Sequence, residues 1–290
     1  MKLIRWRSGT QTLPGIILNG NYYDVSPIGE DYNEGFFESG GLERLQVFIE
    51  ANKNSLKALK EPVSLASPIA RPSKIICIGL NYADHAKETM AEPPAEPIIF
   101  LKSTTALSGP FDPVIIPRNS TKTDWEVELA LVISKKASYV PENEAHRYIA
   151  GYCLHNDISE REFQIERGGT WDKGKGCDSF APLGPFLATP DEIPDVNQLR
   201  LWLKVNGKIM QDGTTANLIF KVPFLISYIS QFMTLLPGDL ISTGTPPGVG
   251  LGMHPPVYLS AGDVMELGID GLGLSRQELR AYQPVTGRSR

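Results

Sequence analysis

Short apolar runs separated by glycine and proline make up most of the chain from residue 73 onward. Most of these runs end before they reach the length of an ordinary helix. Many short strands with turn residues between them favour a mainly β domain over regularly alternating strands and helices. The runs that we expect to form strands are residues 75–79, 97–102, 127–134, 152–157, 183–189, 201–210, 239–245 and 257–260.

Turn residues support the same fold class. Residues 205–208 read Val-Asn-Gly-Lys, and an Asn-Gly pair tolerates the positive φ angles of a type I′ hairpin turn. We therefore expect a hairpin with Asn206 and Gly207 at its tip. The 27 glycines and 23 prolines suit a turn-rich fold and argue against a helical bundle.

The first seventy residues show a different pattern. Two short strand-like pieces, Lys2–Arg5 and Ile16–Leu18, are followed by a helical pattern from Gly41 to Lys60. A loop then leads to residue 72. These features predict a small N-terminal α/β domain of residues 1–70, in front of a mainly β domain with some α+β elements over residues 71–290.

Composition and charge exclude several classes of protein. The 290 residues include 41% hydrophobic and 21% charged side chains, which is ordinary for a globular protein. A net charge of −5 gives no general attraction to nucleic acids or anionic membranes, so neither is expected as a partner. The first residues hold no apolar stretch long enough for a signal peptide, which predicts a cytoplasmic protein. The three scattered cysteines indicate neither a disulfide framework nor a thiolate zinc site.

The segment from Asp124 to Ile133 carries the first candidate site. Side chains of a strand alternate between its two faces, so Glu126 and Glu128 share one face and Val127 lies on the other. If this strand is internal, two carboxylates lie close together on a buried face, which is costly unless a proton or a cation compensates. A divalent metal is the simplest compensation. The alternative is an edge strand with a solvated acidic face.

A third carboxylate follows another apolar run. Asp157 ends the run that begins at Gly151, and functional sites are commonly built where strands end. Glu126, Glu128 and Asp157 would offer three hard oxygen ligands, leaving water and substrate to complete the octahedron that Mg²⁺ or Mn²⁺ prefers. His155 shares the strand face of Asp157, and we interpret it as a structural residue.

Another candidate site follows the run at residues 75–79. His85 and Glu88 are three positions apart, so on a short helix they would share a face and could touch. Such a pair can form a general base, because the carboxylate orients the imidazole and stabilises its charged form. The alternative is an ordinary solvated pair at the surface.

Taken in order, several segments resemble the fumarylacetoacetate hydrolase family. The resemblance covers roughly residues 71–271, and its blocks are IGLNYADHAKE, PIIFLKSTTALSGP, DWEVELALVI, GYCLHNDISEREFQ, KGKGCDSFAPLGPF, NGKIMQDGTTANLIF and LLPGDLISTGTPPGVG. It implies the rolled mixed β-sheet catalytic domain of that family behind a small N-terminal appendage, and a homodimer.

The resemblance also assigns roles to individual residues. Its metal carboxylates coincide with the cluster found by strand parity, and its catalytic pair coincides with the His-Glu pair. The assignments are metal ligands Glu126, Glu128 and Asp157; catalytic residues His85, Glu88 and Lys175; and substrate-binding residues Lys102, Gln211 and Thr245.

The implied chemistry is Mg²⁺- or Mn²⁺-dependent hydrolysis of a carbon–carbon bond. The substrate would be a 2,4-dioxo acid, either an acylpyruvate or a 2,4-dioxo-3-deoxy sugar acid, and the products pyruvate and a carboxylic acid. The same site could instead serve decarboxylation, tautomerisation or hydration of a 2-oxo acid, and some relatives carry the name ureidoglycolate lyase. An alternative of another class is a binding protein that has kept the fold without catalysis.

Overall fold

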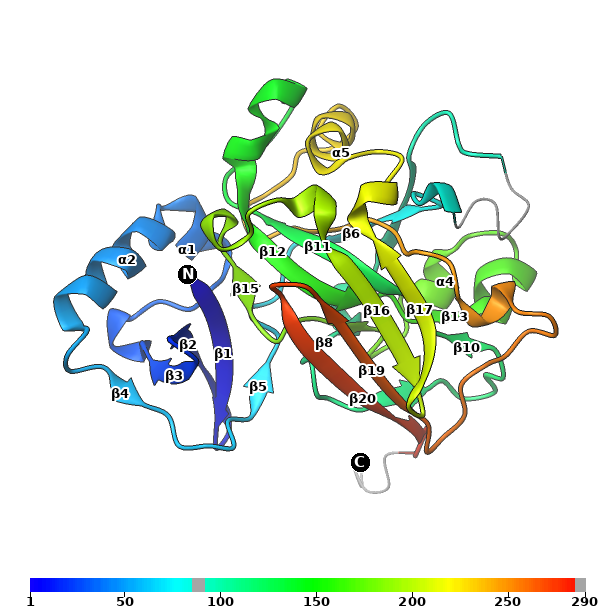
Figure 1. The fold of residues 1–290 in the computed structure, drawn as a ribbon, viewed down its shortest axis with the longest axis horizontal. Coiled ribbons are helices and arrows are strands. Elements are labelled where there is room, and N and C mark those ends of the chain that lie inside the picture. Colours follow the sequence, from blue (N-terminus) through cyan, green and yellow to red (C-terminus); the bar gives the residue numbers. More distant parts are fainter. Residues whose placement is uncertain (85–91, 285–290) are drawn as a thin grey trace, which may run out of the picture.

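Strands dominate the computed structural model, which describes residues 1–84 and 92–284. The described chain contains an 11-stranded sheet and a 5-stranded sheet (Figure 1). The strands of the larger sheet are β1 (Lys2–Ser8), β2 (Gln11–Leu18), β3 (Asn21–Asp24), β4 (Lys57–Ala58), β5 (Leu65–Ala66), β6 (Ile75–Gly79), β7 (Ile98–Lys102), β11 (Val127–Ile133), β12 (Ile149–Asn156), β15 (Leu187–Ala188) and β18 (Leu240–Ser242). Those of the smaller sheet are β9 (Val114–Ile116), β16 (Arg200–Val205), β17 (Lys208–Thr214), β19 (Val264–Ile269) and β20 (Gly273–Ala281). The mainly β class expected from the sequence is confirmed.

Short pairs and short helices complete the described chain. Two further strand pairs join β8 (Leu107–Ser108) to β14 (Ala181–Pro182) and β10 (Thr123–Asp124) to β13 (Ser159–Glu160). The α-helices are α1 (Glu34–Glu38), α2 (Gly41–Asn52), α4 (Asp172–Lys175) and α5 (Val222–Ile229). Short segments of 3₁₀ or π helix are η1 (Ser26–Ile28), η2 (Thr104–Ala106), η3 (Glu142–Tyr148), η4 (Glu162–Glu166), η5 (Pro190–Glu192), η6 (Val196–Gln198), η7 (Thr215–Asn217) and η8 (Gly250–Gly252). No helix in the described ranges is long and apolar enough to cross a membrane.

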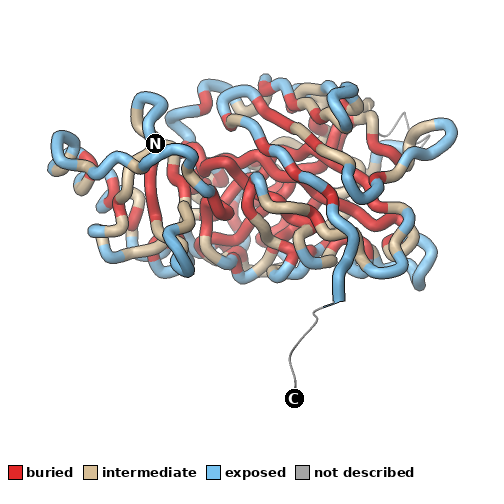
Figure 2. Tube along the Cα trace, turned by 90° about the horizontal axis from the view of Figure 1, so that it is seen from below, coloured by how far each residue is buried: buried red, intermediate tan, exposed pale blue. Residues whose placement is uncertain are grey.

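The larger sheet is mixed and runs through both parts of the chain. Its strand order is β4-β3-β2-β1-β15-β12-β11-β18-β6-β7, with β5 paired to β1. Most neighbours are antiparallel, whereas β18 and β6 are parallel. Because β1 pairs with β15, the N-terminal strands continue the central sheet, as the blue strands of Figure 1 show. The smaller sheet packs over β11 and β12, and buried residues fill the middle of the molecule in Figure 2.

The hairpin expected at Asn206 and Gly207 is confirmed. Val205 pairs with Lys208, and the two tip residues have φ angles of 50° and 80°. Both angles lie in the left-handed region that a type I′ turn requires. The prediction of strand at 257–260 is wrong, because these residues form no regular ladder. Leu259 instead donates its N–H to the carbonyl of Thr123 at 2.8 Å.

The helical pattern of the N-terminal part extends too far. Helix α2 ends at Asn52 and not at Lys60, and Lys57–Ala58 form β4, which extends the sheet beside β3. The amide of Asn52 donates to the carbonyl of Phe48, and asparagine commonly competes with the helical backbone in this way. The helix therefore stops where its own side chain and the sheet offer other partners.

Candidate metal centre and active site

Glu126 and Asp157 lie in a gap between two antiparallel strand pairs. Strands β11 and β12 pair antiparallel down to Val127 and Asn156, and β10 and β13 resume the same register at Asp124 and Ser159. Glu126 and Asp157 lie opposite each other in the gap, where the N–H of Asp157 donates to the Glu126 carbonyl at 2.9 Å. Side chains opposite each other in an antiparallel ribbon are close neighbours on one face.

Glu128 joins them because it lies on β11, two residues after Glu126 along the same extended segment. Its side chain is 1% exposed, and β11 lies between β12 and β18 in the sheet. The strand is therefore internal, and the alternative of a solvated edge strand is wrong. Ligand oxygens of Glu126, Glu128 and Asp157 lie within 4.8 Å of one another.

Three buried basic side chains neutralise two of these carboxylates. Lys175 on α4 places its Nζ 2.7 Å from Glu126 Oε2 and 2.9 Å from Asp157 Oδ2. Lys102, at the end of β7, forms an ion pair with Asp157 from the other side. Arg161 contacts Glu126 Oε1 at 2.7 Å. Helix α4 packs against β7, β13 and η4, and this packing fixes the lysine in place.

These ion pairs explain the shifted pKa values. Burial would raise the pKa of Asp157, but Lys102 and Lys175 hold it well below the ordinary range. Burial would likewise raise the pKa of Glu126, but Lys175 and Arg161 lower it. Burial raises the pKa of Glu128 well above its ordinary value, and the charges of Asp157 and Glu126 raise it further.

Glu128 is held by neutral donors instead of ion pairs. Its Oε2 accepts hydrogen bonds from Ser242 Oγ at 2.6 Å and from the Gly244 N–H at 2.9 Å. His155 Nδ1 lies 2.7 Å from Ser242 Oγ, and burial lowers the pKa of His155 to about 3. If Ser242 gives its one hydrogen to the carboxylate, the neutral imidazole donates to Ser242 through Nδ1. His155 is thus a structural residue that supports Glu128.

The donor set fits a hard dication. Three carboxylate oxygens converge, and carboxylates are the ligands that Mg²⁺ and Mn²⁺ prefer. Glu128 is buried without an ion-pair partner in the described parts of the chain. A bound dication would supply the missing positive charge, which offsets the cost of burying an ionised carboxylate. The three residues form a divalent metal site.

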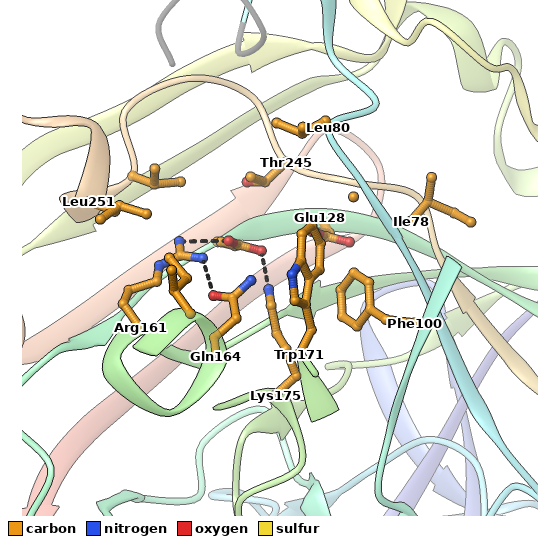
Figure 3. A pocket seen from close by; sticks show the side chains of 14 residues that line it. Ile78, Leu80, Phe100, Glu128, Arg161, Gln164, Trp171, Lys175, Thr245 and Leu251 are labelled. Carbon is orange, nitrogen blue, oxygen red and sulfur yellow. Dashed lines mark hydrogen bonds and ion pairs between the residues drawn. The ribbon is translucent and has the colours of Figure 1, made fainter. Parts of the chain in front are cut away.

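A pocket of about 160 Å³ opens onto this site. Figure 3 shows Arg161 and Gln164 on one side of the carboxylates, with Phe100 and Ile78 on the other. Glu126, Glu128, Lys175 and Thr245 also line the pocket, together with the apolar residues Leu80, Ile165, Trp171, Val249 and Leu251.

Of the three expected substrate-binding residues, Thr245 alone is among the residues that line the pocket. Thr245 lines the pocket, and its hydroxyl donates to the Val127 carbonyl at 2.9 Å. Lys102 is not among the lining residues and contacts Asp157 and the Ile158 carbonyl. Gln211 lies behind Thr245, where its amide donates to Thr245 Oγ1 and to the Pro246 carbonyl, both at 2.8 Å. In this arrangement, Lys102 supports a metal ligand and Gln211 supports the pocket wall.

The expected pair His85 and Glu88 lies outside the described residues. The chain that leads to them is firmly anchored beside the pocket, where Leu80 is part of the wall. The next residue, Asn81, donates to the Thr243 carbonyl at 2.8 Å and accepts from the Phe220 N–H at 2.7 Å.

Sequence reasoning missed Arg161 and Asp124. The Arg161 guanidinium donates from Nε to Asp124 Oδ2 at 2.8 Å and from Nη1 to Gln164 Oε1 at 3.0 Å. Asp124 also accepts from the N–H groups of Gly250 and Leu251, which ties the loop at η8 to the site. The available signal was the charged segment that follows Asp157, since an arginine that close to a carboxylate cluster is a natural partner.

Comparisons with known proteins show the family and the fold. The model for the fumarylacetoacetate (FAA) hydrolase C-terminal domain matches residues 74–280. A protein of Burkholderia ambifaria that carries the name "Putative hydrolase" is 48% identical over 282 residues, covering 97% of this chain and 99% of that protein.

Two solved structures are similar over almost their whole length. A maleylpyruvate hydrolase from Sphingobium sp. SYK-6, solved in complex with manganese (II) ion and pyruvate, superposes with a TM-score of 0.81 at 29% identity, covering 98% of this chain and 100% of that one. A structure from Mycobacterium abscessus, titled "probable 2-hydroxyhepta-2,4-diene-1,7-dioate isomerase", has a TM-score of 0.81 at 31% identity with the same coverage. The two structures thus carry the names of a hydrolase and of a probable isomerase.

Proposed function

Because this chain belongs to the fumarylacetoacetate hydrolase family, we propose that it is a metal-dependent hydrolase that cleaves a carbon–carbon bond of a 2,4-dioxo acid. The products would be pyruvate and a smaller carboxylic acid, and the metal Mg²⁺ or Mn²⁺. The observation that carries the proposal is the group of three buried carboxylates beside Lys175 and Arg161, of which Glu126 and Glu128 line one pocket. The bound manganese and pyruvate of the Sphingobium hydrolase support the same assignment.

The charges of the site suit an anionic substrate. Cationic side chains already neutralise three carboxylates of the group: Lys102, Lys175 and Arg161 balance Asp124, Glu126 and Asp157. Glu128 is the one carboxylate of the group that has no cationic partner. With a dication bound, the group carries a net positive charge at the floor of the pocket. Such a field attracts the carboxylate of a 2-oxo acid. A bound Mg²⁺ or Mn²⁺ supplies Lewis-acid stabilisation of negative charge on oxygen.

Lys175 is placed to bind and orient the substrate. Its ammonium has three donors, of which the contacts with Glu126 and Asp157 use two, and the side chain lines the pocket. Because both partners hold the pKa of Lys175 above its ordinary value despite burial, the group stays charged. A fixed ammonium of this kind holds negative charge that develops on a substrate oxygen.

Proton transfer requires a base, and we assign it to His85. In this proposal His85 takes a proton from the water that attacks the distal carbonyl, and Glu88 orients the imidazole. The support is the resemblance of this segment to the family and the anchoring of Leu80 and Asn81 at the pocket wall. The homodimer, the cytoplasmic location and the domain boundary at residue 70 stay predictions.

The test is a panel of 2-oxo acids with pyruvate release as the readout. The protein is supplied with Mg²⁺ or Mn²⁺ and offered acylpyruvates, 2,4-dioxo-3-deoxy sugar acids and oxaloacetate. We expect pyruvate from a 2,4-dioxo acid, and we expect chelation or His85→Ala to abolish its release. A His85→Ala protein with unchanged turnover would refute the assigned base.

The isomerase-named structure from Mycobacterium abscessus supports a second candidate. Tautomerisation of an unsaturated 2-oxo acid needs a metal site and a proton carrier but no attacking water. Ultraviolet spectra of the same panel would record such a conversion without pyruvate. Pyruvate from oxaloacetate alone would indicate a decarboxylase instead.

A further inference from the structure

The wall of the pocket beyond the carboxylates is apolar. Figure 3 shows Leu80 above the carboxylates, Leu251 to one side and Phe100 to the other. Ile165 and Trp171 line the same space, and Ile165 is 52% exposed although it is a large aliphatic side chain. An exposed apolar side chain at the rim of a pocket is typical of a surface that a ligand covers.

Two polar side chains of the pocket, Arg161 and Thr245, already have several partners within the protein. Arg161 is bonded to Asp124, Glu126 and Gln164, and the Thr245 hydroxyl is bonded to Val127 and Gln211. A tail with several hydroxyl groups would therefore lose hydrogen bonds to water and find few partners in the described wall. Burying a hydroxyl without a partner costs about 1–3 kcal/mol.

Leu80 is part of this wall, and its backbone is strained. Its φ angle is 52°, a left-handed conformation that costs a non-glycine residue about 1 kcal/mol or more. Asn81 holds the strained turn through its hydrogen bonds to Thr243 and Phe220. Gly79 makes room for the Trp171 ring, because a Cβ at this position would lie 2.6 Å from Trp171 Cζ3. The left-handed backbone at Leu80 and the absence of a side chain at Gly79 thus allow Leu80 and Trp171 to line the pocket.

We propose that the pocket takes a 2-oxo acid whose tail ends in an alkyl group, and not in a hydroxymethyl or carboxylate group. The inference rests on the proposed function for the 2-oxo acid end of the ligand. Leu80 is its specificity-determining residue. The cations that line the described wall are Arg161 and Lys175, and both are held at the metal-site carboxylates, where the 2-oxo acid end binds, and not at the far end of the tail.

The test measures binding and does not depend on turnover. Calorimetry on the Mn²⁺-loaded protein compares 2-oxohexanoate, 6-hydroxy-2-oxohexanoate and 2-oxoadipate, which differ only at the end of the tail and contain no cleavable 2,4-dioxo unit. We expect 2-oxohexanoate to bind at least about tenfold more tightly than either analogue. Equal or tighter binding of the hydroxylated or dicarboxylic analogue would overturn the inference.

A matched pair of variants tests the wall itself. Asparagine adopts the left-handed conformation readily, so Leu80→Asn keeps the backbone and replaces the apolar group with a polar one. It should reduce the preference for 2-oxohexanoate about tenfold. Tyr139→Asn is the control, because Tyr139 has a similar φ angle of 51° but is 76% exposed and does not line the pocket. Its preference should equal that of the parent.

Ile165→Gln provides a second variant if Leu80→Asn fails to fold, because its exposed position carries little of the core. An unchanged preference in the variant that folds would contradict the role of the apolar wall. Pyruvate release from 2,4-dioxohexanoate is measured in parallel. If the alkyl preference holds in binding but no pyruvate appears, the proposed hydrolysis is wrong and the inference about the tail stands.

Discussion

The two sides of the metal centre are neutralised in different ways. On the side of Glu126 and Asp157, buried ammonium and guanidinium groups balance the carboxylates. On the side of Glu128, a hydroxyl and a backbone N–H are the partners, and no cationic side chain of the described residues compensates the carboxylate charge. The ion pairs of Glu126 and Asp157 therefore stabilise the fold whether or not a metal is bound. Ionisation of the Glu128 carboxyl is costly until a dication binds.

Removal of Asp157 should have the largest effect. Asp157→Ala leaves Lys102 and Lys175 buried with one carboxylate partner fewer, so the free energy of unfolding should fall by about 3–5 kcal/mol. Denaturant unfolding of the metal-free protein measures this. Asp239→Ala is the control for a buried, ion-paired aspartate elsewhere; it should lose stability but keep Mn²⁺ binding. An Asp157→Ala protein as stable as the parent would contradict the structural role of the first side.

Glu128→Gln should separate metal binding from stability. The amide keeps an oxygen for Ser242 and Gly244 and removes a buried carboxylate, so the metal-free protein should be as stable as the parent or more so. The affinity for Mn²⁺ should fall about 100-fold, as measured by calorimetry. Glu160→Gln, a buried glutamate outside the triad, should leave that affinity unchanged. A large loss of stability in metal-free Glu128→Gln would mean that the two sides do not differ.

Metal loading should stabilise the parent protein by mass action. At a free Mn²⁺ concentration 100 times the dissociation constant, the free energy of unfolding should rise by about 2.7 kcal/mol. Thermal unfolding with Mn²⁺ and with chelator measures the difference. At the same Mn²⁺ concentration, Glu128→Gln should lose most of this gain. Equal gains in both proteins would place the ion somewhere other than this triad.

Ser242→Ala should give the smallest effect and refine the comparison. The change removes the hydroxyl that orients Glu128 and leaves His155 Nδ1 without its partner. Supporting residues of this kind commonly contribute tenfold to 100-fold in metal affinity, and we expect about tenfold here. Ser275→Ala removes a buried serine hydroxyl on β20 of the smaller sheet that bonds to Pro110 and to no triad carboxylate, and it should not change Mn²⁺ affinity. Equal affinities in the two variants would refute the supporting role.

The sequence predicts the side chains that local periodicity places. Strand alternation put Glu126 and Glu128 on one face, and the internal position of β11 decided between the two alternatives that periodicity left open. Arg161 could not be placed in the same way, because its role depends on Asp124, which approaches only through the pairing of β10 with β13.

Strand β20 shows why part of the fold was missed. Its inward residues include Ser275 and Gln277, which are buried and bond to the Pro110 carbonyl. A buried face made of polar residues gives no apolar alternation to read. The signal lies in hydrogen bonds to a distant loop, which only the assembled structure supplies.

The pairing of β18 with β6 has a consequence for how the protein folds. This parallel ladder joins Ile241 to Ile76, residues that are far apart in the sequence, and it brings Ser242 beside Glu128. Closing such a long loop is slow and comes late. The ion can bind tightly only after this step, so Mn²⁺ should slow unfolding while refolding proceeds at its metal-free rate.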